Sequence, residues 1–199
     1  MDPMVLTVDQ RSSRSRPDLV PSLLADLSTL ATLRPFERTA GDEIQGIVDD
    51  PAVAVAVLRT LLRRGEWNIG VGVGRVELPL PDQARAGRGP AYLHARDAVN
   101  RAKQVPAHLC VVGDDGYRAD QLETVLWLWN SLVERRSERG WEVADLIGHG
   151  LSHAEAGSRL GVSQSAVSQR ARAAHVIETE RAARLAHQLI AEMMGQEAS

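Results

Sequence analysis

The sequence predicts an α+β domain followed by an all-α domain, on three observations. Short strand-like apolar runs alternate with amphipathic helical stretches from residue 4 to about residue 112. Beyond about residue 120, the apolar spacing is helical throughout. With 199 residues, 44% of them apolar, the chain is long enough for two small cores. We therefore expect domains over residues 1–116 and 141–199, joined by a connecting helix over 117–140.

The elements expected in the first domain alternate in a mixed order. Strands are expected over residues 4–9, 36–40, 44–48, 67–73, 75–80 and 109–112, and helices over 19–33, 51–64 and 90–103. Short linkers join the second strand to the third and the fourth to the fifth, which predicts two hairpins. The resulting order, β-α-β-β-α-β-β-α-β, indicates a mixed sheet with helices on one face.

The second half of the chain is expected to be helical. Helices are predicted over residues 120–139, 141–149, 153–160, 163–172 and 177–194. The last of them has an apolar stripe that includes Leu185, Leu189 and Met193. This stripe has two equally good partners, which are its copy in a second chain and its own domain.

Residues 150–174 contain the signals of two short helices that meet at a tight turn. Ser152 and Glu155 have the spacing of a capping box, which opens a helix. Gly161 supplies the positive φ that ends this helix, Val162 is an apolar plug for the corner, and Ser163 is a fresh N-cap. The spacing predicts a helix-turn-helix, with an ordinary helical hairpin as the alternative.

The second of these helices has a polar face without acids, suited to a DNA major groove. Its candidate DNA-binding residues are Ser163, Gln164, Ser165, Ser168, Gln169, Arg170 and Arg172. The run resembles the helix-turn-helix domains of bacterial regulators and sigma-factor-like proteins, with Gly157 where a small residue, usually Ala, precedes the Leu-Gly pair. Glycine costs roughly 1 kcal/mol of helix propensity, so this helix is expected to depend on tertiary packing.

Composition limits the class of protein. The formal net charge of −3 argues against indiscriminate binding to nucleic acid, so any DNA-binding surface must be local. Arg159, Arg170, Arg172 and His175 form one small basic patch, which favours a homodimer that contacts two half-sites. No apolar run approaches the roughly 18 residues that span a bilayer, and the N-terminus does not have the pattern of a signal peptide, so we expect a cytoplasmic protein without a membrane partner. The single Cys110 is expected to be a buried strand residue.

Three carboxylates in the first domain are candidate metal ligands. Asp9 ends the first strand, and Asp42 and Glu43 lie at a predicted hairpin tip. Carboxylates brought together either titrate or hold a cation, and Mg²⁺ is typically held by one or two of them with substrate phosphates. A plain hairpin turn is the alternative for the Gly41-Asp42 pair, because both residue types are common in turns.

Four strings in this domain resemble the class III nucleotidyl cyclase fold, a ferredoxin-like sheet with helices. They are the strand that ends at Asp9, the run Arg38-Thr-Ala-Gly-Asp42, the glycine-rich run of residues 69–76, and the helix start that ends at Arg96. The resemblance implies Asp9 and Asp42 as ligands of two metal ions, and Arg38, Gly41 and Arg96 as contacts of a nucleotide. Tyr92 stands where the family has Asn, and Arg38 where it has Lys, so phosphate binding is expected to survive these changes better than turnover.

A closer resemblance over the same region is to the bacterial SatD family. The Gly-Asp-Glu-x-Gln-Gly run of residues 41–46 is its most specific piece, and Gly89-Pro-Ala-Tyr92 is another. Family members pair this domain with a C-terminal helical segment, often a helix-turn-helix. The resemblance implies a fold more than a function.

The motifs and their order favour a DNA-binding transcriptional regulator whose cyclase-like domain senses a nucleotide or only dimerises. Two alternatives stay open. One is a magnesium-dependent, cyclase-like enzyme that acts on nucleoside triphosphates, and the other is a non-catalytic scaffold or interaction protein. DNA and a nucleotide are the candidate partners, and no cofactor beyond magnesium with that nucleotide is implied.

Overall fold

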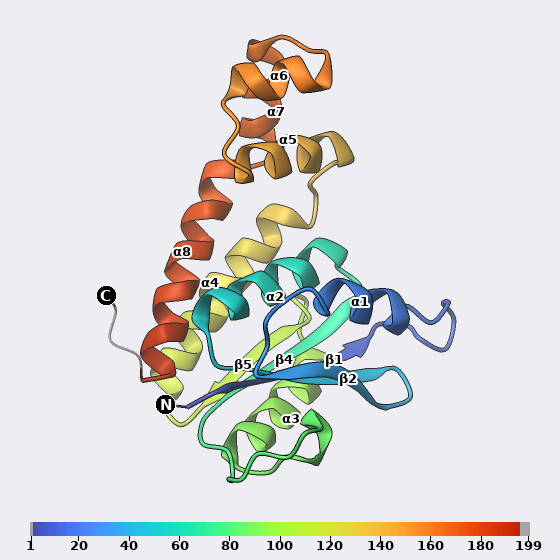
Figure 1. Cartoon of the computed structure of the whole chain (residues 1–199), viewed down its shortest axis with the longest axis vertical. Coiled ribbons are helices and arrows are strands. Elements are labelled where there is room, and N and C mark those ends of the chain that lie inside the picture. The colour runs from blue at the N-terminus through green and yellow to red at the C-terminus, as the bar shows by residue number, and fades with distance from the viewer. Residues whose placement is uncertain (1, 196–199) are drawn as a thin grey trace.

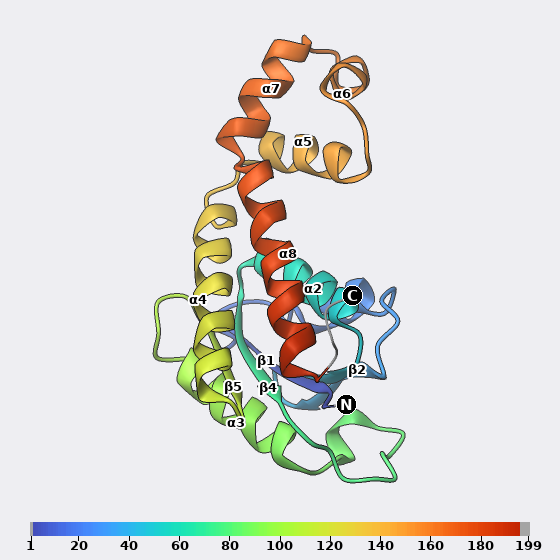
Figure 2. The same ribbon diagram turned by 90° about the vertical axis from the view of Figure 1, so that its left-hand side faces the viewer.

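The computed structural model describes residues 2–195 and has an α+β fold. Within these residues one five-stranded mixed sheet is accompanied by eight α-helices. The molecule is elongated, with the sheet at one end and a group of three short helices at the other (Figure 1). Two long helices run between these ends (Figure 2).

The bounds of the elements follow the chain. The strands are β1 (Met4–Gln10), β2 (Arg34–Ala40), β3 (Glu43–Val48), β4 (Trp67–Val73) and β5 (Leu109–Gly113). The helices are α1 (Val20–Leu27), α2 (Pro51–Arg64), α3 (Pro90–Ala102), α4 (Gly116–Val133), α5 (Glu138–Gly148), α6 (His153–Leu160), α7 (Gln164–Ala173) and α8 (Val176–Met193). One 3₁₀ turn, η1 (Ala84–Ala86), precedes α3.

The sheet has the order β2-β3-β1-β4-β5, with β1 at its centre. β1 is antiparallel to both of its neighbours, whereas β4 and β5 are parallel. The register places Asp9 opposite Glu43 on one side and opposite Asn68 on the other. Directly opposite residues of an antiparallel pair lie on the same face, so this register gathers polar side chains on one face of the sheet.

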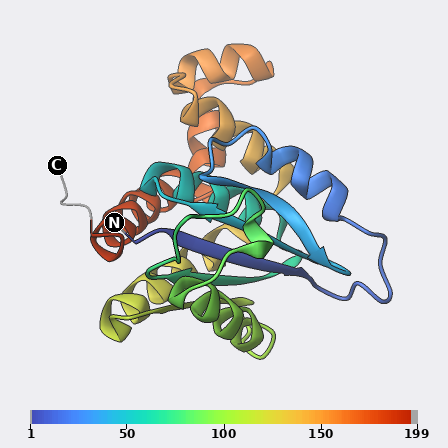
Figure 3. The ribbon, with the colours of Figure 1, turned by 60° about the horizontal axis from the view of Figure 1, so that its bottom comes forward.

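Helices cover both faces of the sheet. The prediction that helices lie on one face only is therefore wrong. Met4, Leu6 and Val8 of β1 lie in the main core with buried residues of α1, α2, α4 and α8. Val5, which points to the other face, packs with alanines of α3. Figure 3 shows α3 on the opposite side of the sheet from α1 and α2. A strand places alternate residues on alternate faces, and β1 is buried on both.

Several element boundaries differ from those expected. The strand predicted over residues 75–80 is irregular, since Pro79 and Pro81 have no N–H to donate to a ladder. The helix expected to reach residue 33 ends at Leu27, where Ser28 and Thr29 bond back to carbonyls of the preceding turn. The helix expected to reach residue 139 ends at Val133, and Ser137 caps a separate helix through the N–H of Gly140.

The glycines of β4 allow α3 to lie almost on the sheet backbone. A Cβ at Gly70 would lie 2.3 Å from the Val99 nitrogen, and one at Gly72 would lie 2.2 Å from the Ala95 nitrogen. These glycines therefore mark a close approach of two backbones. On the same face Cys110 is buried against α3, and burial raises the pKa of its thiol to about 11. The prediction of a buried strand cysteine is confirmed.

The last helix returns to the sheet. Ala183, Ala186, Leu189 and Ile190 of α8 are buried in the main core, beside α2 and α4. A smaller, separate cluster that includes Val143, Ala156 and Val167 holds α5, α6 and α7 together. The expectation that α8 packs on its own helical domain is therefore wrong, because its main contacts are with α2 and α4 of the sheet-containing part of the chain.

The close packing of α3 on β4 gives the first prediction. Gly70→Ala is expected to lower the free energy of unfolding by about 1 to 3 kcal/mol, because the added methyl group overlaps backbone that cannot move aside. Urea unfolding followed by circular dichroism measures the change. The matched control is Gly116→Ala, where a Cβ meets nothing within 4 Å. Equal stability of Gly70→Ala and the wild type would contradict the packing.

Candidate nucleic-acid interface and carboxylate cluster

The corner between α6 and α7 is built by the signals in the sequence. The Ser152 hydroxyl accepts from the Glu155 backbone N–H at 3.3 Å, and the Ser152 N–H donates to the Glu155 carboxylate at 2.8 Å. Hydrogen bonds to the carboxylate from the Ser152 hydroxyl, at 2.6 Å, and from the Ser152 N–H hold the pKa of Glu155 below its usual range. Gly161 ends α6 with φ +66°, and the Ser163 hydroxyl accepts from the Ala166 N–H at 3.2 Å. The capping box, the turn and the second cap are confirmed.

The corner is tight. A Cβ at Gly157 would lie 2.8 Å from the Val162 carbonyl oxygen, so the turn passes directly over α6 at this glycine. Val167 and Ala171 bury the inner face of α7 in the small core. The opposite face of α7 is consequently turned to solvent.

The candidate DNA-binding residues fall into two groups. Gln164, Gln169 and Arg172 are exposed, and no other described residue bonds to their side chains. Ser163 and Ser165 are also exposed, and their hydroxyl oxygens lie 2.9 Å apart.

The second group is partly buried and consists of Ser168 and Arg170. Ser168 is hydrogen-bonded to His153 of α6 at 2.9 Å, which ties the two helices together. The freest polar side chains of α7 are therefore those of Gln164, Gln169 and Arg172.

The carboxylate cluster lies on the face of the sheet covered by α3. Asp9 accepts a hydrogen bond from the Asn68 amide at 3.2 Å and forms an ion pair with the Lys103 ammonium at 2.9 Å. The Glu43 carboxylate, which is nearly buried, forms a two-pronged ion pair with Arg96 and accepts from the Thr39 hydroxyl at 2.6 Å. The Arg96–Glu43 hydrogen bond raises the pKa of Arg96. Each of these two carboxylates is thus paired with a cation.

The hairpin between β2 and β3 has its own charge pair. Arg38 donates to the Gly41 carbonyl oxygen and forms an ion pair of 2.6 Å with Asp18. The hydrogen bond from Arg38 lowers the pKa of Asp18. Asp42 occupies the turn, where its carbonyl oxygen accepts from the Gln10 N–H at 3.2 Å. Arg38 and Gly41 are therefore close together, whereas Arg96 is bound to Glu43.

The residues present do not fit a metal centre as they are arranged. Within residues 2–195, no group of three or more His, Cys, Asp and Glu side chains lies close enough to hold an ion. Lys103 and Arg96 occupy the places beside Asp9 and Glu43 that a cation would take. In this arrangement Asp9, Asp42 and Glu43 therefore do not form one three-carboxylate site.

Two members of this cluster, Asn68 and Lys103, are not predicted from the sequence. Lys103 follows Arg96 by seven residues, which places both on one side of α3, and this spacing was an available signal. Asn68 is brought to Asp9 by the pairing of β1 with β4. No pattern in a single strand reveals that register.

Comparison with protein-family models, with curated proteins and with solved structures finds no match. Within the described part of the chain, none of the helices has the length and apolar character needed to cross a membrane.

The Glu43–Arg96 pair gives the second prediction. Arg96→Met is expected to lower the free energy of unfolding by about 1 kcal/mol, since it leaves the Glu43 carboxylate without its cation while Arg96 itself is half exposed. Adding Glu43→Gln is expected to recover part of that loss, a coupling that a double-mutant cycle measures. Arg88→Met, at an exposed arginine outside the cluster, is the control. Strictly additive effects would show that the pair contributes nothing.

Proposed function

We propose that the protein is a DNA-binding transcriptional regulator in which α7 enters the major groove. The observation that carries the proposal is the free polar face of α7, formed by Gln164, Gln169 and Arg172. This face belongs to a capped, tightly turned helix pair at the end of the molecule farthest from the sheet (Figure 1).

The chemistry of this face suits DNA. Glutamine amides pair with adenine edges in the major groove, and arginine pairs with guanine or with phosphate. The exposed Arg159 adds positive charge beside α7. Because the chain as a whole has a net charge of −3, specific contacts and a second half-site must supply most of the affinity. The proposed DNA-binding form is accordingly a homodimer in the cytoplasm.

The α+β part is proposed to be a nucleotidyl cyclase-like domain of the SatD type that senses a nucleotide or mediates dimerisation. The central β1 and the polar residues at its end support this proposal, with Arg38 and Gly41 adjacent at the neighbouring hairpin. Catalysis through two metal ions has weaker support, because Lys103 and Arg96 neutralise Asp9 and Glu43. Product formation from ATP or GTP with Mg²⁺, above an Asp42→Ala control, would instead favour the enzyme.

A thermal-shift panel of nucleotides separates a sensor from a scaffold. A ligand present at 100 times its dissociation constant is expected to stabilise a sensor by about 2.7 kcal/mol. If no nucleotide raises the melting temperature, the result would favour the non-catalytic scaffold.

The third prediction concerns DNA binding itself. Selection from random oligonucleotides is expected to yield a defined site, and Arg172→Ala is expected to weaken binding to that site by roughly 1 to 3 kcal/mol if Arg172 contacts a base. Fluorescence anisotropy at fixed salt measures the affinity. Arg184→Ala, which removes the same charge from an exposed position of α8, is the matched control.

The regulator proposal fails under either of two outcomes. One is that selection recovers no preferred sequence and binding falls steeply with salt, as expected for contacts to phosphate alone. The other is that Arg172→Ala and Arg184→Ala weaken binding equally, since general charge would then explain the effect.

A further inference from the structure

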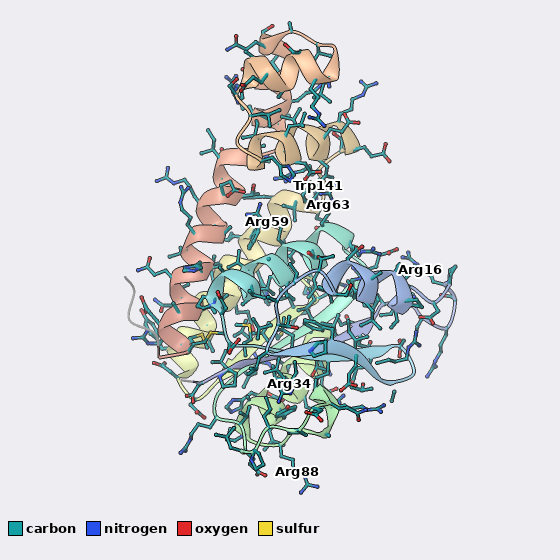
Figure 4. The ribbon with its side chains drawn as sticks, in the orientation of Figure 1. Arg16, Arg34, Arg59, Arg63, Arg88 and Trp141 are labelled. Atoms are coloured by element: carbon teal, nitrogen blue, oxygen red, sulfur yellow. The ribbon has the colours of Figure 1, made fainter. Side chains whose placement is uncertain are left out.

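The junction between the sheet and the three short helices contains two neighbouring cavities. The larger has a volume of about 300 Å³ and the smaller about 130 Å³. Arg63 of α2, Trp141 of α5 and Arg136 of the α4–α5 linker line both of them. Figure 4 labels Arg63 and Trp141 at this junction, together with Arg59.

The wall shared by the cavities is a stack of cations on an indole ring. The guanidinium carbon of Arg136 lies 4.3 Å from the centre of the Trp141 ring, and that of Arg63 lies 4.6 Å from it. Arg63 also forms a bidentate ion pair with Asp145 of α5, at 2.8 and 2.9 Å. The stack therefore connects α2 of the sheet-containing part to the first helix of the helix-turn-helix.

The larger cavity has an excess of positive charge. Its lining includes Arg11, Arg63, Arg64 and Arg136, with Glu134 as the one acidic residue in that lining. Arg63 and Arg64 already have carboxylate partners in Asp145 and Asp26. Within residues 2–195, Arg11 and Arg136 form no ion pair with a carboxylate. These two arginines donate instead to neutral groups, Arg11 to the Gly65 carbonyl oxygen and Arg136 to the Thr179 hydroxyl, each at 3.0 Å.

The lining also holds two buried hydrogen-bond donors without a partner among the described residues. Trp67 is 2% exposed, and its indole N–H has no partner among the described residues. The Nε–H of Arg136 is likewise buried and unpartnered within the described chain. Burial lowers the pKa of Arg136, and the nearby Arg59 lowers it further. Burial and the charge of Arg11 also lower the pKa of His108, another residue of the lining. Buried donors without a hydrogen-bond partner, next to arginines that contact no carboxylate, are the environment of an anion site.

We propose that this cavity binds a small oxyanion of the phosphate class, held by Arg11 and Arg136. Arginine suits this ligand because its planar guanidinium donates two parallel hydrogen bonds to a phosphate. The volume of about 300 Å³ accommodates orthophosphate or the phosphate end of a small metabolite. The cavity is distinct from the carboxylate cluster, which lies at α3 on the other face of the sheet.

The site is placed where binding is coupled to the helix-turn-helix. Arg136 precedes α5 and stacks on Trp141, which lies within α5. An anion that binds Arg136 is therefore expected to change the orientation of α5. On the proposed function, which this step assumes, such an anion changes DNA affinity by shifting the helix-turn-helix relative to α2. The binding site itself does not depend on that function.

Titration calorimetry on the full chain tests the site without DNA. The probes are orthophosphate and ribose 5-phosphate at constant ionic strength, with sodium chloride as the blank. Saturable binding is expected, with a change in tryptophan fluorescence. Arg11→Gln and Arg136→Gln are each expected to weaken it about tenfold or more, the range for a lost hydrogen bond between charged groups. Tighter binding of ribose 5-phosphate would identify a phosphorylated metabolite, and equal binding would identify free phosphate.

Arg14→Gln is the matched control, because it removes the same charge from an exposed position outside the cavity and should bind within about twofold of the wild type. If Arg136→Gln does not fold, Arg11→Gln carries the test. Absence of saturable binding by either probe, or equal weakening by all three variants, overturns the proposal. A chain that binds the probes but selects no DNA site retains the anion site and loses only the regulator function.

Discussion

The group of three short helices, α5 to α7, is held at both of its ends by helices that pack on the sheet. α4 leads from the sheet to α5, and α8 returns from α7 to bury Ala186, Leu189 and Ile190 beside α2 and α4. These buried residues have no role in the small core of α5, α6 and α7. The position of α7, and with it the direction of its polar face, therefore depends on the main core. The stack of Arg63 and Arg136 on Trp141 lies at the junction of α5 with these packed helices.

The contact of α3 with β4 has a comparable consequence on the other face of the sheet. With no side chains at Gly70 and Gly72, the helix backbone sits against the strand backbone. This depth brings Arg96 and Lys103 to the carboxylates of Glu43 and Asp9. The acidic cluster that resembles a metal site is consequently a set of ion pairs. The glycines of β4 thus serve the packing of α3 on the sheet.

Local signals predicted much of the helical half. The capping box at Ser152, the turn at Gly161 and the cap at Ser163 act through hydrogen bonds within a few residues, so their geometry follows from the sequence alone. The strands β1 and β3 were also placed within one residue of their observed bounds. The strand expected over residues 75–80 does not form, although Val76, Leu78 and Leu80 alternate there, because Pro79 cannot donate to a ladder.

The amino-acid sequence by itself determined the elements, their caps and the polar face of α7, because these depend on periodicity and on contacts between near neighbours. Only the tertiary structure decided what the long-range partners are. It paired Asp9 with Lys103 across 94 residues and Arg63 with Asp145 across 82, and it returned α8 to the sheet. Contacts of this kind arise from strand register and helix docking, which a single sequence does not encode in any local pattern. For this reason the capped helix pair of residues 153–173 was visible before the structure, whereas the ion-paired carboxylates and the basic cavity were not.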